Sequence, residues 1–167
     1  SDNPYLSDFY NDMKRWSFNL QVFFLHKRFE MHQKMSASLT SVIQDRTIYE
    51  DLEIFAKNLY RIGKLSQRDW DNYCGLFEVM NFYLKRPDLI IYLKADTDTL
   101  LRRIKKRGRN YENSIDREYI HTLNISYDRW IESISDQPVM IIETDYFNIY
   151  EDAEAFNNIQ KDILKRL

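Results

Sequence analysis

Residues 88–93, with the sequence Asp-Leu-Ile-Ile-Tyr-Leu, form a continuous apolar run directly after Pro87. Such a run predicts a strand that is buried on both faces. Residues 97–107 follow with the apolar spacing of a helix, and residues 139–142, Val-Met-Ile-Ile, predict another buried strand. Strands that alternate with helices indicate an α/β fold in which helices cover both faces of a parallel sheet.

The rest of the chain is mostly helical in pattern. Apolar spacing and capping residues predict helices over residues 8–35, 47–63, 66–86, 116–134 and 153–167, and residues 40–44 predict a third, short strand. Asp45 and Arg46 follow that strand, at the end where ligands gather in open parallel sheets. Three strands are few for so many helices, so the chain is expected to begin in the middle of a fold.

Composition restricts the class of protein. The 167 residues suit one domain, and a net charge of −2 argues against general binding to nucleic acids or membrane surfaces. No apolar run is long enough to span a membrane and no signal peptide is visible. The single Cys74 excludes an internal disulfide and indicates a reducing compartment. We therefore expect a soluble cytoplasmic protein.

Two common kinds of site have little support. The three histidines are scattered, and one cysteine is too few for a cysteine metal cluster. A glycine-rich phosphate loop needs several glycines around a Lys-Ser/Thr pair, and the chain has only Gly63, Gly75 and Gly108.

Six cationic side chains crowd into residues 102–109. Arg103 and Arg107 share a helix face, while Gly108 can end the helix and direct Arg109 elsewhere. Converging guanidinium groups suit a transferring phosphoryl group, whose charge spreads over several oxygens. The alternative is a solvated basic helix end that the helix dipole favours.

Polar side chains also occur in apolar helical segments. Gln21 is surrounded in sequence by Leu, Val and Phe, so it either lies at a wet helix edge or hydrogen-bonds a partner in the interior. Its amide, one donor group and one acceptor, matches the edge of a nucleobase. Arg28 lies two turns further along the same face and can pair with Asp51, although that pair can be purely structural. Tyr10, Trp16 and Phe55 can supply stacking walls or ordinary core.

Four blocks of sequence together resemble the deoxynucleoside kinase family, most closely its bacterial deoxyadenosine/deoxyguanosine kinases. The blocks are Asn-Pro-Tyr-Leu at 3–6, Arg-Trp-Ser-Phe-Asn-Leu-Gln at 15–21, Gln-Asp-Arg-Thr-Ile-Tyr-Glu-Asp at 44–51 and Lys-Arg-Gly-Arg-Asn-Tyr-Glu at 106–112. The resemblance implies a three-layer, P-loop-kinase-like α/β fold with a five-stranded parallel sheet. It also implies transfer of the γ-phosphate of ATP, or another nucleoside triphosphate, with Mg²⁺ to the 5′-hydroxyl of deoxyadenosine, deoxyguanosine or deoxycytidine in nucleotide salvage.

The resemblance also implies roles at the base end of a nucleoside pocket. Gln21 would read the base edge with two hydrogen bonds. Arg28 and Asp51 would complete that end of the pocket, and Trp16 and Phe55 would flank the base.

Further roles concern the sugar and the phosphates. Tyr10 and Glu112 would hold the 3′-hydroxyl, and Arg46, which follows Asp45, would sit near the 5′-oxygen. The resemblance implies that three arginines, Arg103, Arg107 and Arg109, form a lid that closes on the phosphates. A weaker match implies that the loop after the last strand, with Asp145 and Phe147, contacts the base of the phosphate donor.

The chain departs from the family in one large respect. The family's first strand, phosphate-binding loop, helix and second strand would all precede residue 1, so we expect residues 1–167 to be the remainder of one kinase domain and not to turn over alone. We also expect a homodimer, with the aromatic-rich helix at 66–85 as a contact unless its apolar face is core.

Two other hypotheses stay open. The chain can be a non-catalytic nucleoside-binding module, or an enzyme like the nucleoside monophosphate kinases. The second explains the basic segment but not the helix around Gln21.

Overall fold

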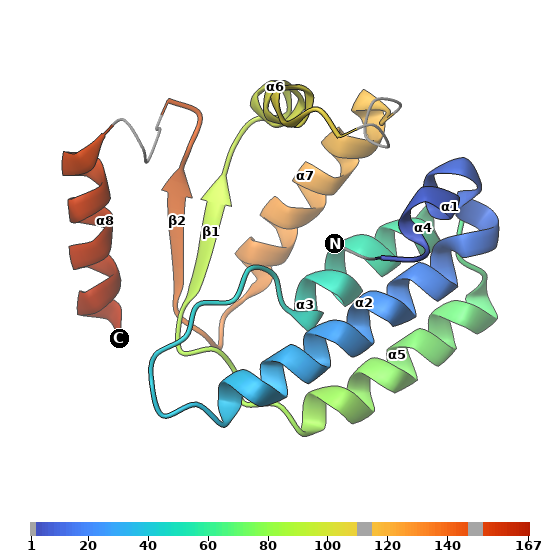
Figure 1. The fold of residues 1–167 in the computed structure, drawn as a ribbon, viewed down its shortest axis with the longest axis horizontal. Coiled ribbons are helices and arrows are strands. Elements are labelled where there is room, and N and C mark those ends of the chain that lie inside the picture. The colour runs from blue at the N-terminus through green and yellow to red at the C-terminus, as the bar shows by residue number, and fades with distance from the viewer. Residues whose placement is uncertain (1–2, 110–114, 147–151) are drawn as a thin grey trace. The chain divides into compact units, whose positions relative to one another are not determined.

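The computed structural model describes residues 3–109, 115–146 and 152–167 (Figure 1). The chain divides into two compact units, residues 1–85 and residues 86–167, which are considered separately below.

The first unit is built from helices. They are α1 (Leu6–Asn11), α2 (Met13–Ser36), α3 (Ile48–Glu50), the π-helical turn η1 (Asp51–Ala56), α4 (Lys57–Arg61) and α5 (Gln67–Phe82). Two clusters of buried side chains hold them together, one around Phe9, Leu20 and Leu59, the other around Leu25 and Tyr73. Full burial of one such side chain contributes roughly 1.5–3 kcal/mol, so these clusters fix α2 against its neighbours.

The helix predicted over residues 8–35 is in fact two helices. Asp12 leaves the helical conformation, with φ −145° and ψ 84°, and its side chain accepts a hydrogen bond from the Arg15 backbone N–H at 3.1 Å. An aspartate at a helix N-cap satisfies an amide that would otherwise lack a partner. This local bond ends α1 and starts α2.

The strand predicted over residues 40–44 is not formed, and this prediction was wrong. The side chain of Ile43 is 90% exposed and no strand lies in the described part of the first unit. A strand is stable only with a neighbour to satisfy its backbone groups, and residues 40–44 have none among the described residues of this unit. The helix start predicted at Thr47 is confirmed, with a capping box to Glu50.

The second unit confirms the α/β class. It contains β1 (Ile90–Lys94), α6 (Thr97–Arg107), α7 (Arg117–Ser133), β2 (Val139–Glu143) and α8 (Ala153–Arg166). The strands β1 and β2 pair in parallel, with Ile90 opposite Val139 and Lys94 opposite Glu143. Because the first and last residues of β1 pair with the first and last residues of β2, both strands end at the same edge of the sheet (Figure 1).

The strands are less buried than their apolar sequences predict. Leu93 in β1 and Ile141 in β2 are 63% and 52% exposed. A two-stranded sheet in the described unit leaves part of its surface uncovered. The prediction that these strands are buried on both faces was therefore wrong.

The basic helix forms where the sequence predicts it. Asp96 caps α6 by accepting from the Thr99 N–H at 2.6 Å. Gly108 ends the helix in the left-handed conformation, φ 65°, which glycine adopts without the strain that a Cβ brings. The backbone therefore turns away from the helix axis after Arg107, and Arg109 lies beyond the end of α6.

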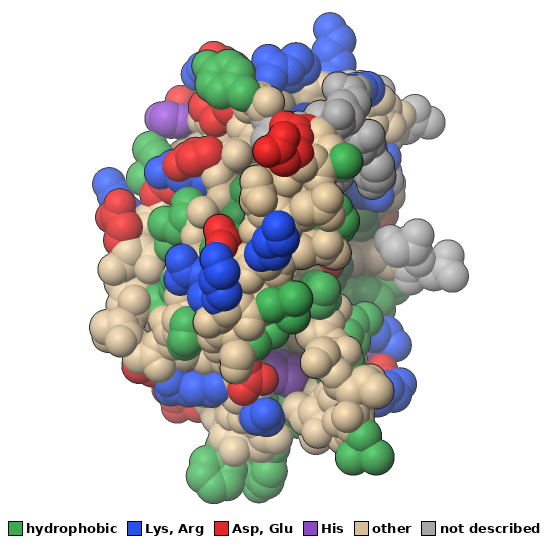
Figure 2. All heavy atoms as spheres, turned by 90° about the vertical axis from the view of Figure 1, so that its left-hand side faces the viewer, with side chains coloured by type: hydrophobic (Ala, Val, Ile, Leu, Met, Phe, Trp, Pro, Cys, Tyr) green, Lys and Arg blue, Asp and Glu red, His purple; other side chains and the backbone are tan. Residues whose placement is uncertain are grey.

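One face of the molecule carries side chains of mixed character (Figure 2). On the face in Figure 2, which includes α8, acidic and basic side chains lie interspersed with hydrophobic ones. Within the described residues, no helix combines the length and apolar character needed to cross a membrane.

Candidate functional site

The pair predicted between Arg28 and Asp51 is present. Arg28 Nη1 donates to both carboxylate oxygens of Asp51, at 2.6 and 2.8 Å. The Arg28 guanidinium also lies over the ring of Phe24, 5.0 Å from its centroid. Arg28 lies on α2 and Asp51 in the first turn of η1, so the pair links two elements through residues that are 23 apart in the sequence.

Burial dominates the electrostatics of this pair. Asp51 is 1% exposed, and burial raises the pKa of its carboxyl to about 7, while the nearby Arg28 charge acts in the opposite direction. Burial also raises the pKa of the Tyr73 hydroxyl, and the Asp51 charge adds to that rise. Buried charge with shifted protonation is typical of functional sites, although structural networks show it as well.

Gln21 is buried and incompletely hydrogen-bonded. Its side chain is 3% exposed, and its Oε1 has no hydrogen-bond partner among the described residues. Leaving such an acceptor without a partner costs about 1–3 kcal/mol. A ligand that donates to this oxygen would recover that free energy, and the prediction that Gln21 reads a base edge fits this state.

Arg46 lies in an unusual backbone conformation beside an aromatic ring. Its φ of 63° is in the left-handed region, which a residue with a Cβ seldom adopts. Its guanidinium lies over Phe55, 5.0 Å from the ring centroid, and its charge reaches Asp51. The structure therefore brings Arg28 and Arg46 to Asp51 and Phe55 on η1, with the exposed Asp45 next to Arg46 in sequence.

Tyr10 and Trp16 are half-buried and pack against the same cluster around Phe9 and Leu20. Trp16 also contacts Arg15, whose guanidinium lies 4.4 Å from its ring centroid. Both aromatic side chains thus contribute to the core, and their roles beside a base and a sugar stay predictions.

The arginines predicted to form a lid occupy the second half of α6 and the residues after it. Arg103 Nη1 donates to Thr144 Oγ1 at 3.0 Å, and Nη2 donates to the Thr144 carbonyl. Arg107 is the last residue of α6, and Arg109 follows Gly108; both are exposed. Closure of these arginines on phosphates stays a prediction.

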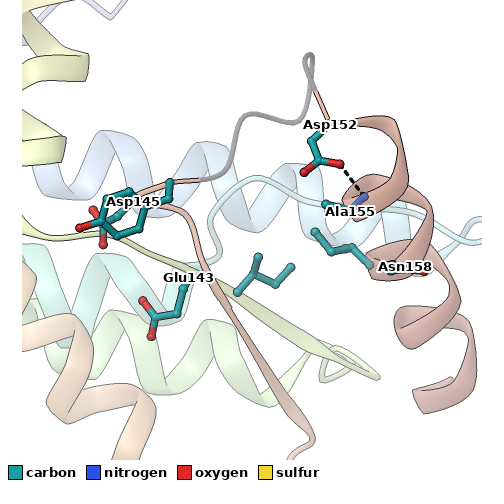
Figure 3. Close-up of a pocket in the computed structure, with 8 residues that line it drawn as sticks. Glu143, Asp145, Asp152, Ala155 and Asn158 are labelled. Carbon is teal, nitrogen blue, oxygen red and sulfur yellow. Dashed lines mark hydrogen bonds between the residues drawn. The ribbon is translucent and has the colours of Figure 1, made fainter.

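Asp145 lies directly after Thr144 at the end of β2. Its carboxylate accepts from the Asp96 backbone N–H at 3.0 and 3.2 Å, and this bond, with a further one from Thr99, lowers the pKa of the carboxyl. Asp145 also lines a cavity of about 750 Å³ between the end of β2 and the start of α8 (Figure 3). Phe147 and Glu112 lie outside the described residues.

Two residues near these sites had no individual role in the sequence analysis. Thr144 was only part of the loop after the last strand, although it stands at the carboxyl end of a parallel strand, and that position is a usable signal. Tyr73 is fully buried and close enough for Asp51 to affect its hydroxyl. No sequence signal separates it from the other core aromatics on α5.

The described side chains alone do not form a metal site. Among residues 3–109, 115–146 and 152–167, no three His, Cys, Asp or Glu side chains are arranged to hold a metal ion. The described residues therefore assign no ligand to the expected Mg²⁺.

Comparison with known proteins gives a consistent result. A family model described as deoxynucleoside kinase matches residues 1–167. The chain is similar to the deoxyadenosine/deoxycytidine kinase of Bacillus subtilis (strain 168), with 38% identity over 163 residues, covering 96% of this chain and 75% of that protein. It is also similar to the deoxyadenosine kinase of Dictyostelium discoideum, with 42% identity over 134 residues, covering 80% of this chain and 54% of that protein.

Solved structures give the same picture. The deoxyadenosine kinase from M. mycoides with bound dATP superimposes with a TM-score of 0.82 at 32% identity, covering 96% of this chain and 82% of that one. The same enzyme with bound dCTP gives a TM-score of 0.81 at 30% identity, with 96% and 81% of the two chains covered.

Proposed function

This chain belongs to the deoxynucleoside kinase family, and from that premise we propose that its protein phosphorylates the 5′-hydroxyl of deoxyadenosine, deoxyguanosine or deoxycytidine with ATP. Residues 1–167 contain no glycine-rich Lys-Ser/Thr loop. The proposal of turnover concerns the protein to which these residues belong, and these residues supply the nucleoside-recognition and arginine-helix parts.

The observation that carries the proposal is the set of buried polar groups along α2. Gln21 has an acceptor without a partner, and Arg28, seven residues later, holds Asp51 in a buried ion pair. Buried polar groups are costly unless they are satisfied, so a helix that retains them beside an apolar core suits recognition of a polar, planar ligand.

Base recognition follows from the chemistry of these groups. The Gln21 amide offers one acceptor and one donor group, which suits the adjacent amine and ring nitrogen of adenine or cytosine. In the proposal, Arg28 and Asp51 hold each other in a fixed position at the base end, and Trp16 and Phe55 lie against the base. Tyr10 and Glu112 complete the pocket at the 3′-hydroxyl.

Phosphoryl transfer needs positioning and positive charge more than covalent chemistry. The 5′-oxygen forms a bond to the γ-phosphorus and releases its proton to water, while the bond from that phosphorus to the β,γ-bridging oxygen breaks and gives the nucleoside diphosphate. Arg46, after Asp45, would lie near the 5′-oxygen. Arg103, Arg107 and Arg109 would stabilise charge on the transferring group, with Mg²⁺ on the donor phosphates, and Asp145 and Phe147 would lie near the donor base.

The proposal extends to the setting of the enzyme. We place it in nucleotide salvage in the cytoplasm, as a homodimer. Exposed apolar side chains on and just after α5, among them Val79, Phe82 and Tyr83, suit a contact between two copies. Light scattering of the purified protein tests this: twice the chain mass is expected, and a monomer at micromolar concentration contradicts it.

The activity is tested by product identification. The protein from the complete reading frame is incubated with Mg²⁺, ATP and each deoxynucleoside in turn, and the products are separated by chromatography and assigned by ³¹P NMR. We expect a 5′-monophosphate and ADP in equal amounts from at least one of the three deoxynucleosides.

The other outcomes distinguish the alternatives. Phosphorylation of deoxyadenosine monophosphate but not of deoxyadenosine would replace the proposal with a monophosphate kinase. Binding of a deoxynucleoside in calorimetry with no product would replace it with a non-catalytic binding module.

A further inference from the structure

Thr144 is fixed at the edge of the sheet where β1 and β2 both end. Its backbone N–H and its Oγ1 each donate to the Lys94 carbonyl, both at 2.8 Å, and the residue is 6% exposed. Because the hydroxyl hydrogen is used in this bond, the lone pairs of Oγ1 remain to accept a further bond.

Arg103 uses these acceptors. Its two terminal nitrogens donate to Oγ1 and to the carbonyl oxygen of Thr144, so one residue provides both acceptors for the guanidinium. Charge-assisted bonds of this type are about twice as strong as neutral ones and restrict the orientation of a guanidinium. Arg103 is thereby held toward the end of β2 although it lies on an exposed part of α6.

Asp145, the residue after Thr144, is hydrogen-bonded to the N-terminal end of α6. Asp145 accepts from the backbone N–H of Asp96, the residue that caps α6. Thr99 in the first turn of α6 accepts from Arg102 at 3.0 Å and adds to the influences on Asp145. The first turn of α6 and Arg103 are therefore both attached to residues 144–145.

We propose that Thr144 is a positioning residue, which sets the orientation of Arg103, and with it α6, for binding the phosphates of the donor nucleotide. This inference rests on the kinase function proposed above. Thr144 acts through Arg103, since its own hydroxyl is occupied by the Lys94 carbonyl. Loss of the hydroxyl leaves the Thr144 carbonyl as an acceptor but removes the second point that fixes the guanidinium.

The test compares variants of the complete protein by two measurements. The first is the dissociation constant for inorganic tripolyphosphate from calorimetry, which needs no turnover. The second is kcat/KM for ATP and for the deoxynucleoside. Thr144→Val removes the hydroxyl and keeps the shape, Thr144→Ser keeps the hydroxyl, and the exposed Thr40→Val is the matched control.

We expect Thr144→Val to weaken tripolyphosphate binding and to lower kcat/KM for ATP, each about tenfold, in line with the loss of one charge-assisted hydrogen bond. KM for the deoxynucleoside stays within about twofold. Thr144→Ser and Thr40→Val resemble the wild type. In an Arg103→Ala background, Thr144→Val has no further effect, because the two residues act as a unit.

Three other results would overturn the inference. Thr144→Val could bind tripolyphosphate as tightly as the wild type does, or it could weaken that binding by the same factor in the Arg103→Ala background as in the wild type. The wild type could also fail to bind tripolyphosphate at all. If the wild type binds tripolyphosphate but produces no monophosphate, the proposed kinase function fails, and the binding data alone judge the role of Thr144.

Discussion

At the scale of single residues, the buried pair of Arg28 and Asp51 has a large energetic consequence. Both side chains are mostly out of water, with 15% and 1% of their areas exposed. The free energy gained by forming such a pair is small, because desolvation offsets the attraction. Removal of one partner is different, since it leaves an uncompensated charge in the interior.

We therefore expect Asp51→Ala to lower the free energy of unfolding by about 3 kcal/mol. Urea unfolding followed by tryptophan fluorescence measures it, with Trp16 and Trp70 as reporters in the same unit. Glu53→Ala is the matched control, because Glu53 pairs with Lys57 on the partly exposed surface and should cost at most about 1 kcal/mol. An equal decrease in the free energy of unfolding in Asp51→Ala and Glu53→Ala would contradict the claim that Arg28 and Asp51 form a buried ion pair in which each charge needs the other.

The pKa of Asp51 predicts a pH dependence of stability. Burial raises it to about 7, above the 3.8 of an unperturbed aspartate, so the folded state binds an extra proton between these values. The stabilisation is complete below about pH 4 and is lost as the pH rises to 7. The wild type should therefore lose stability relative to Asp51→Asn between pH 4 and 7.

Urea titrations of both proteins at four pH values test this prediction, because other titrating groups cancel in the difference. A wild type that gains stability relative to Asp51→Asn as the pH rises would show that the ion pair with Arg28 outweighs the effect of burial.

At the scale of elements, helix ends were easier to predict than continuous helices. Gly108 ends α6 as the sequence predicts, because a left-handed glycine acts locally, and the structure adds Asp96 as the cap at the start of that helix. The break at Asp12 was missed, because apolar spacing continues through it while its side chain caps α2. Residues 40–44 form no strand, since a strand depends on a neighbour and the local pattern does not report one.

Two glycines give a matched test at this scale. A Cβ on Gly108 or on Gly75 would meet no atom within 4 Å, so substitution by alanine changes backbone energetics alone. Gly108 is left-handed, and Gly108→Ala should destabilise by about 1–2 kcal/mol. Gly75 lies inside α5, and Gly75→Ala should stabilise by about 0.5–1 kcal/mol.

Thermal unfolding followed by circular dichroism gives the two signs. The predicted result is a lower midpoint for Gly108→Ala and a higher one for Gly75→Ala. Shifts in the same direction would mean that the two glycines do not differ in backbone conformation as described.

At the scale of the whole molecule, the sequence predicted the family, the α/β class and the ion pair of Arg28 with Asp51. These depend on motifs and spacing within short segments. The contact of Arg103 with Thr144 was not predictable in the same way, because it joins residues 41 apart whose meeting depends on the register of β1 and β2. The fully buried Tyr73 beside Asp51 is a similar case.

The central claim is that α2 recognises the base of a deoxynucleoside through Gln21, and calorimetric titration with deoxyadenosine, deoxyguanosine and deoxycytidine tests it most directly. We expect the wild type to bind at least one of them and Gln21→Ala to bind it at least about tenfold more weakly, because its hydrogen bonds to the base are lost. The exposed Gln33→Ala on the same helix should bind within about twofold of the wild type. Wild-type affinity in Gln21→Ala, or no heat from any of the three nucleosides, would contradict the claim.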